Sequence, residues 1–128
     1  MTSPEKNPSR HKETGREGES LAVSHLEKEG YEILTRNYRC RYGEVDIIAR
    51  ENDCLVFIEV KSRRSLRFGE PCEAIDLRKQ KKLSRTALHY LQSRGWMNRN
   101  ARFDTLFIRL AAGGNELRLI RNAFEVCL

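Results

Sequence analysis

Two carboxylates and a lysine lie in the most hydrophobic part of the sequence. Asp46 follows Val45, and Glu59 and Lys61 end the run Leu55-Val56-Phe57-Ile58-Glu59-Val60-Lys61. A charge inside a buried strand costs free energy unless a partner compensates it. Carboxylates can bind a metal ion and a lysine can hold a phosphate, so these residues are the first candidates for chemistry.

The apolar segments 43–49 and 55–61 flank a polar turn and predict a β-hairpin. With a two-residue turn at Asn52-Asp53, Asp46 lies opposite Glu59. A three-residue loop would shift the register by one and separate them. In the first register, alternation places four charged residues on one face of the hairpin. They are Glu44, Asp46, Glu59 and Lys61.

Two facing carboxylates repel, so one stays protonated unless a cation intervenes. A divalent ion such as Mg²⁺ is a natural cation for carboxylate oxygens, and Lys61 would orient an anion bound there. The alternative is a set of ordinary salt bridges on a solvated hairpin face. Both faces carry apolar residues, however, which favours a covered central strand. Ile48, Leu55 and Phe57 share the charged face, and Val45, Ile47, Val56, Ile58 and Val60 form the other.

The length of 128 residues suits one domain, expected over residues 13–128 after a disordered polar tail at 1–12. No segment approaches the roughly 18 consecutive apolar residues of a membrane span, so we expect no membrane association. The first residues lack an apolar signal-peptide core, which predicts a cytoplasmic protein. The four cysteines are far apart, so we expect reduced thiols and no zinc site. They are Cys40, Cys54, Cys72 and Cys127.

The net charge of +6 is concentrated in one stretch, Lys61–Arg85, which holds nine basic and three acidic residues, 9 − 3 = +6. Such a patch is typical of a surface that binds nucleic-acid phosphates, although a solvated helix face is the alternative. The candidate nucleic-acid-binding residues are Arg63, Arg64, Arg67, Arg78, Lys79 and Lys82. Gln80 is a further candidate to face the substrate.

The remaining patterns predict the elements that position these residues. A helix over 14–29 should end at Gly30, and Glu19 would lie on its buried stripe, or else be an exposed first-turn glutamate. We expect a short strand over 31–34, an irregular link over 37–43 and a helix from 73–76 to Arg94. Strands over 102–110 and 116–121 complete an α/β sandwich with a central mixed sheet flanked by helices.

Asp46 with Glu59-Val60-Lys61 resembles the PD-(D/E)xK signature of restriction-endonuclease-like nucleases, except that Val45 stands at the proline position. The wider pattern is similar to the YraN family of bacterial proteins. It comprises Gly15-Arg16-Glu17-Gly18-Glu19, Asn37-Tyr38-Arg39, Gly43 to Ala49, Val56 to Arg63, Gly69-Glu70-Pro71, Ala74-Ile75, Arg102-Phe103-Asp104 and Asn122-Ala123-Phe124.

The resemblance implies a restriction-endonuclease-like three-layer sandwich and a metal-dependent endonuclease. Asp46, Glu59 and the Val60 carbonyl would hold Mg²⁺ or Mn²⁺, and Lys61 would assist the attacking water. Glu19 is similar to an extra acidic ligand of archaeal Holliday-junction resolvases. Glu44 is expected to pair with Lys61.

The expected substrate is nucleic acid, with DNA favoured, including branched or junction DNA, and the protein would act as a homodimer if it follows junction-cutting relatives. Two other classes of function stay open. One is a non-catalytic nucleic-acid-binding module of the same fold, and the other is an interaction domain for an acidic protein.

Overall fold

The computed structural model describes the backbone of residues 8–64 and 75–126, and the side chains from Gly15 onward within those ranges. Arg67, Cys72 and Cys127 lie outside the described residues. The elements are α1 (Pro8–Lys28), β1 (Glu32–Cys40), β2 (Gly43–Glu51), β3 (Cys54–Arg64), α2 (Leu77–Arg94), β4 (Asn100–Leu110) and β5 (Glu116–Phe124).

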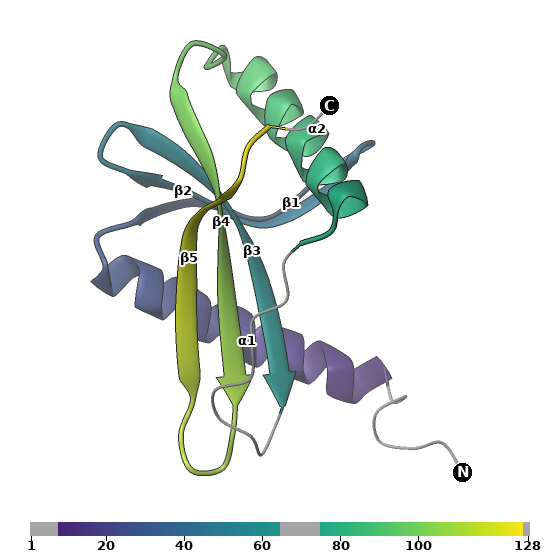
Figure 1. Ribbon diagram of the computed structural model, residues 1–128, viewed down its shortest axis with the longest axis vertical. Helices are drawn as coiled ribbons and strands as arrows, with labels where there is room; N and C mark the ends of the chain where they lie inside the picture. Colours follow the sequence, from purple (N-terminus) through teal and green to yellow (C-terminus); the bar gives the residue numbers. More distant parts are fainter. Residues whose placement is uncertain (1–7, 65–74, 127–128) are drawn as a thin grey trace.

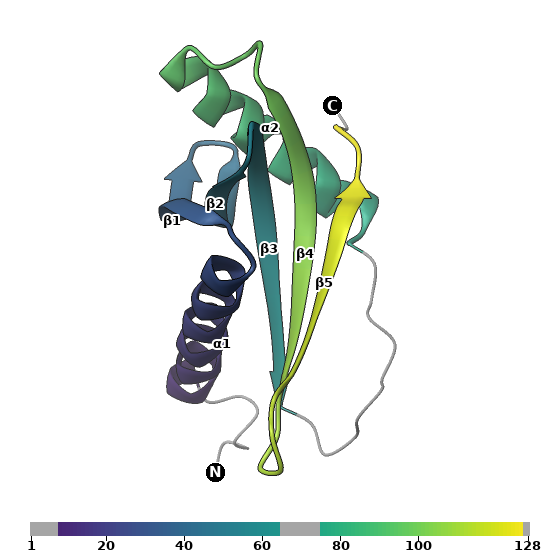
Figure 2. The same cartoon turned by 90° about the vertical axis from the view of Figure 1, so that its left-hand side faces the viewer.

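The five strands form one sheet in the order β1-β2-β3-β4-β5. β3 and β4 are parallel and the other neighbours are antiparallel. A parallel pair needs a crossover, and α2 lies in the connection between β3 and β4. In Figure 1, α1 runs behind β3, β4 and β5, while β1 and β2 lie across the vertical run of those strands. Figure 2 shows the sheet from its edge, with α1 beside β3.

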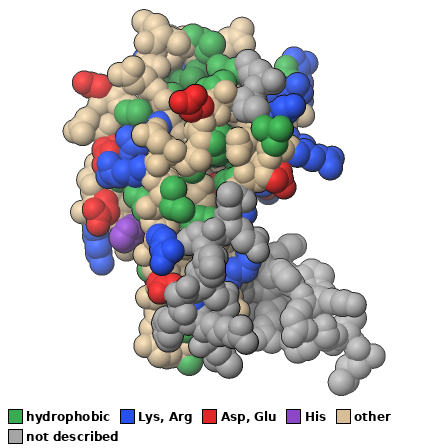
Figure 3. Space-filling view, in the orientation of Figure 1, with side chains coloured by type: hydrophobic (Ala, Val, Ile, Leu, Met, Phe, Trp, Pro, Cys, Tyr) green, Lys and Arg blue, Asp and Glu red, His purple; other side chains and the backbone are tan. Residues whose placement is uncertain are grey.

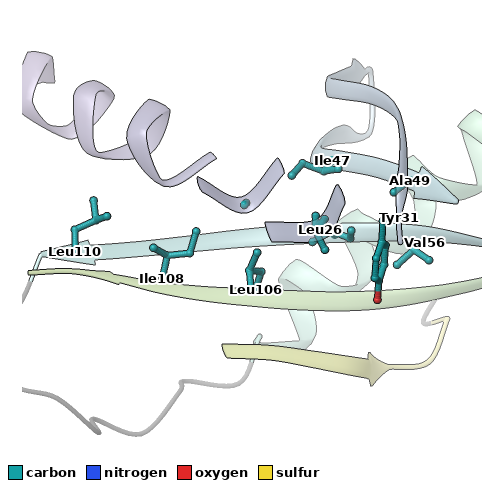
Figure 4. Close-up of a cluster of buried hydrophobic side chains, with 10 residues drawn as sticks. Leu26, Tyr31, Ile47, Ala49, Val56, Leu106, Ile108 and Leu110 are labelled. Carbon is teal, nitrogen blue, oxygen red and sulfur yellow. The ribbon is translucent and has the colours of Figure 1, made fainter. Parts of the chain in front are cut away.

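Each helix covers its own face of the sheet with a separate apolar cluster. Ala22 and Leu26 of α1 pack with residues of β2, β3 and β4 on one face (Figure 4). Leu83, Ala87 and Tyr90 of α2 pack with residues such as Phe57 on the other face. The predicted α/β class and three-layer sandwich with a central mixed sheet are therefore confirmed.

The helix boundaries follow local signals. The Asp76 side chain caps α2 by accepting a hydrogen bond of 2.8 Å from the Lys79 backbone N–H. Gly95 ends α2 with a φ of 71°, a left-handed conformation that glycine adopts without strain. Helix α1 begins at Pro8 instead of Thr14, so it overlaps the tail expected over 1–12. Residues 1–7 of that tail lie outside the described residues.

The irregular link predicted over 37–43 is wrong, because β1 continues to Cys40 and pairs with β2 along its length. The sequence suggested a break because Asn37 favours turns, and its φ is indeed 53°. The strand absorbs this irregularity, together with a register shift between Ile33 and Thr35, because β2 supplies its hydrogen-bond partners.

The predicted hairpin register is confirmed, since Glu51 pairs with Cys54 and Ile47 with Ile58. The pairing of β2 with β3 ends at Ile47 and Ile58. Beyond Ile47, β2 continues alongside β1, and Val45 packs in the cluster under α2. The expectation that Val45 shares a face with Ile47 is therefore wrong, because strict alternation applies only where a strand keeps one plane.

No helix in the described part of the chain is both long and apolar enough to cross a membrane.

Candidate active site

Asp46 and Glu59 lie side by side where β2 and β3 separate. The Asp46 carboxylate accepts a hydrogen bond of 2.8 Å at Oδ2 from the Val60 backbone N–H. Burial, followed by the neighbouring charge of Asp46, raises the pKa of Glu59 to about 7. Burial also raises the pKa of Asp46, and the charges of Glu19 and Glu44 add to it. The two carboxyl groups therefore form a pair that is not fully ionised at neutral pH in the absence of an added cation.

The backbone N–H and C=O groups of Val60 both point toward Asp46. In an extended strand the N–H and C=O of one residue point to the same side. Because the Val60 N–H reaches Asp46, its carbonyl also points toward β2. This orientation is the one that a backbone ligand beside Asp46 requires.

Glu19 approaches the pair from α1. Gly18 packs closely against Ser62 of β3, which places the middle of α1 against this strand. The Glu19 side chain is only 16% exposed. Its Oε1 accepts hydrogen bonds from Arg36 Nε at 3.3 Å and Asn37 Nδ2 at 2.9 Å. Glu19 thus faces inward instead of projecting into solvent, and its negative charge helps to raise the pKa of Asp46.

Asp46, Glu59 and Glu19 do not form a three-carboxylate cluster in this structure. In the described ranges, no three His, Cys, Asp or Glu side chains gather closely enough to hold a metal ion by themselves. Asp46 and Glu59 are adjacent, whereas Glu19 is held back by its two partners on β1. A third carboxylate ligand would require Glu19 to exchange those partners.

Lys79, and not Lys61, is the cation that contacts the pair. Lys79 Nζ lies 3.5 Å from Glu59 Oε1. Lys61 makes no ion pair with a described residue, and its Nζ lies 6.0 Å from the centre of the Phe107 ring. The expected pairing of Glu44 with Lys61 is wrong, because Glu44 Oε2 pairs with Arg39 Nε at 3.0 Å. Past Ile47, the neighbour of β2 is β1, so β1 supplies the cation.

The predicted basic residues within the described ranges are all exposed, and two of them, Arg64 and Lys79, also pair with a carboxylate. Arg64 pairs with Glu17 at 2.6 Å, and Arg63 is exposed at the end of β3. Arg78 and Lys82 are exposed on α2. Gln80 is half-buried and donates a hydrogen bond of 2.8 Å to the Ile75 carbonyl. Figure 3 shows Lys and Arg side chains over α2 at the upper right of the molecule.

A second charged cluster, to which the sequence assigned no role, lies at the other end of β2. Asp104 is 1% exposed and accepts hydrogen bonds from Arg102 Nε at 3.1 Å and Tyr31 OH at 3.2 Å. Arg102 also donates to Glu51, which binds Arg121 through both oxygens. The cluster joins the start of β1 to β2, β4 and β5. The signal in the sequence was the alternation Arg102-Phe103-Asp104, which places both charges on one face of a strand.

Thr105 and Arg109 of β4 are also missing from the sequence prediction. Thr105 pairs with Glu59 across the parallel strands, and Arg109 pairs with Arg63. Both residues are buried, and Thr105 Oγ1 and Arg109 Nη1 have no hydrogen-bond partner among the described residues. The apolar run around them hid this feature, because it reads as an ordinary core strand.

The sequence also matches known proteins. A family model described as "Uncharacterised protein family UPF0102" matches residues 18–108. The UPF0102 protein of Syntrophus aciditrophicus is 49% identical over 113 residues, which cover 88% of this chain and 89% of the relative. That of Caldicellulosiruptor saccharolyticus is 48% identical over 115 residues, which cover 88% of this chain and 98% of the relative.

Among solved structures, SfsA of Pyrococcus furiosus in complex with Ca²⁺ matches with a TM-score of 0.41 and 18% identity. The match covers 87% of this chain and 62% of that one. The sequence matches decide the family, in agreement with the motifs from Gly15 to Phe124. The chain belongs to the uncharacterised protein family UPF0102, the YraN family.

Proposed function

We propose that the protein is a Mg²⁺- or Mn²⁺-dependent nuclease that hydrolyses phosphodiester bonds in nucleic acid. The observation that carries this proposal is the adjacent pair Asp46 and Glu59, which is largely buried and which a basic stretch follows in the sequence. DNA is the favoured substrate, including branched or junction DNA, as the resemblance to junction-cutting nucleases implies.

The donor set fits a divalent cation. Burial and like charge raise the pKa of both Asp46 and Glu59, and a cation would remove the repulsion that opposes their ionisation. Oxygen ligands of this type suit Mg²⁺ and Mn²⁺. The Val60 carbonyl would be a third protein ligand. Glu19 would join directly or through water after releasing Arg36 and Asn37.

When bound, the metal would polarise the phosphate and lower the pKa of a coordinated water. The chain itself would hold the substrate in place. Lys61 follows Glu59 by two residues on the same strand face, so its ammonium would donate to the attacking water or to a phosphate oxygen. Arg63, Arg78 and Lys82, which are exposed, would hold flanking phosphates.

The second candidate is a nucleic-acid-binding module without catalysis. One observation favours it: each acidic side chain of the site already has a partner in the protein. Asp46 accepts from Val60, Glu59 contacts Lys79, and Glu19 accepts from Arg36. A site satisfied in this way can persist without a metal.

A cleavage panel separates the two functions. Labelled single-stranded, duplex, flap and four-way-junction DNA, with matching RNA, would be incubated with Mg²⁺, Mn²⁺ or EDTA. We expect metal-dependent cleavage by the wild type and none by Asp46→Asn, while Asp53→Asn, an exposed turn variant, keeps full activity. Equal activity of the Asp46 variant would indicate a contaminant, and no cleavage with retained binding would support the module.

The oligomeric state is part of the proposal. A homodimer would present two metal sites to a branched substrate. Sedimentation velocity of the wild type alone and with a four-way junction measures it directly, and a monomer in both conditions contradicts the dimer.

A further inference from the structure

We propose that Lys79 is an internal counter-ion, which neutralises the carboxylate pair in the metal-free protein and leaves when a divalent cation binds. This inference rests on the proposed metal site and describes how that site is regulated. In the metal-bound protein, the released ammonium becomes a ligand for a nucleic-acid phosphate.

The first support is the contact itself. Lys79 Nζ lies 3.5 Å from Glu59 Oε1, and no other described lysine or arginine forms an ion pair with Glu59 or Asp46. The charge of Lys79 also acts on both carboxyl groups, lowering the pKa of each against the opposing effect of burial. One lysine thus serves as the cation for a pair of acids.

The second support is the position of Lys79 on α2. Its backbone N–H is held by Asp76 in the first turn, so the helix is anchored without the Lys79 side chain. That side chain is 45% exposed, whereas the Glu59 side chain is 12% exposed. The ammonium therefore reaches the pair from the solvent side on a flexible four-carbon stem. It can leave without unpacking the core beneath α2.

The third support is charge. A divalent cation bound to Asp46 and Glu59 would lie close to the carboxylate that Lys79 now contacts. Two positive groups at such a short separation repel each other strongly. The cation and the ammonium therefore compete for the pair. Once released, the ammonium joins Arg78 and Lys82 on the exposed part of the same helix. Metal binding would in this way add a charge to the surface that meets the phosphates.

The test measures Mn²⁺ affinity without any substrate. Full-length wild type, Lys79→Met and Lys81→Met would be titrated with Mn²⁺, with free Mn²⁺ followed by electron paramagnetic resonance. Lys81 is an exposed lysine two residues along α2 with no role in the site, and its replacement changes the net charge by the same amount. We expect the Kd of Lys79→Met to fall by about three- to tenfold and that of Lys81→Met to stay within about twofold of wild type.

Equal affinities for the two variants would overturn the proposal, and so would weaker binding by Lys79→Met. These outcomes leave the proposed function intact, provided that the wild type binds Mn²⁺ and Asp46→Asn does not. Binding by Lys79→Met alone would support a counter-ion strong enough to exclude the metal. If neither the wild type nor Lys79→Met binds Mn²⁺ more tightly than Asp46→Asn does, both the proposed metal site and the proposed counter-ion role of Lys79 are wrong.

A second measurement follows the release directly. Lysines of the wild type would be acetylated with a limiting amine-reactive ester, in EDTA or in Mg²⁺, and quantified by mass spectrometry. We expect Mg²⁺ to increase labelling of Lys79 at least about twofold relative to Lys81, because the freed ammonium loses its carboxylate partner. Unchanged relative labelling, in a protein that binds the metal, would contradict the exchange.

Discussion

The Val60 backbone N–H donates a hydrogen bond of 2.8 Å to Asp46 Oδ2, just beyond the last paired residues of β2 and β3. The bond replaces the ladder at the point where the two strands separate. It keeps Asp46 beside Glu59 although β2 turns away to follow β1. The candidate active site thus lies at a fork in the sheet, where side chains from both strands and from both helices can meet.

The raised pKa of Glu59 predicts how stability depends on pH. Its pKa is 4.5 in an unperturbed carboxyl and about 7 in the fold, so the folded protein holds more protons between these values. Stability should therefore fall as the pH rises through this window. Glu59→Gln removes this titration and should raise the free energy of unfolding at pH 8, in EDTA, by on the order of 1–2 kcal/mol.

Thermal unfolding followed by circular dichroism at pH 5, 6, 7 and 8 checks this prediction. Glu27→Gln, an exposed residue of α1, is the matched control and should follow the wild-type profile. If the wild type instead gains stability relative to Glu59→Gln from pH 5 to pH 8, the pKa of Glu59 is not raised by folding.

Removal of the Lys61 ammonium should affect catalysis more than binding. Lys61→Met is expected to lower the rate of cleavage by about 10²- to 10³-fold, because a positioned donor acts mainly on the transition state. Affinity for nucleic acid in EDTA should change less than about tenfold. Lys28→Met, at the exposed end of α1, removes the same charge and should change neither quantity. A parallel loss of rate and affinity would make Lys61 a binding residue only.

The contact between Gly18 and Ser62 predicts a steric effect on stability. A Cβ on Gly18 would overlap Ser62 Oγ and lie 2.8 Å from Ser62 Cβ, so Gly18→Ala should lower the free energy of unfolding by about 1–3 kcal/mol. Gly15→Ala has nothing within 4 Å and should be neutral or stabilising. Denaturant titrations measure both.

Ser62→Gly in the Gly18→Ala background should recover part of the loss, because it removes the atoms that clash. The cost of the double variant should then be smaller than the sum of the two single costs. Strict additivity would mean that the two residues are not in contact.

The cluster around Asp104 should contribute to stability and not to metal binding. Asp104→Asn removes the charge that partners the half-buried Arg102 and weakens the bonds from Tyr31 and Asn122. We expect the free energy of unfolding to fall by about 2–4 kcal/mol, as for other broken buried pairs. Asp53→Asn is the exposed control. Mn²⁺ affinity of the Asp104 variant below its unfolding temperature should equal that of wild type, and a loss would connect this cluster to the site.

Local patterns account for what could be predicted from the sequence. The turn at Asn52-Asp53 and the apolar alternation on either side determine the hairpin register, because both act within a few residues. The caps Asp76 and Gly95 likewise bound α2 at the expected places. The errors lie where two strands separate. Val45 and Glu44 follow β1 instead of β3, and no local signal marks that change of neighbour.

The sequence by itself determined the hairpin register that brings Asp46 near Glu59, because strand pairing across a short turn is a local property of the chain. It also determined that a basic stretch follows them. Only the tertiary structure decided which cation meets the pair. Lys79 reaches Glu59 because α2 packs across the sheet, and Glu19 is drawn to Arg36 because β1 passes beside α1. These contacts depend on the packing of elements distant in the chain, which spacing along the sequence does not encode.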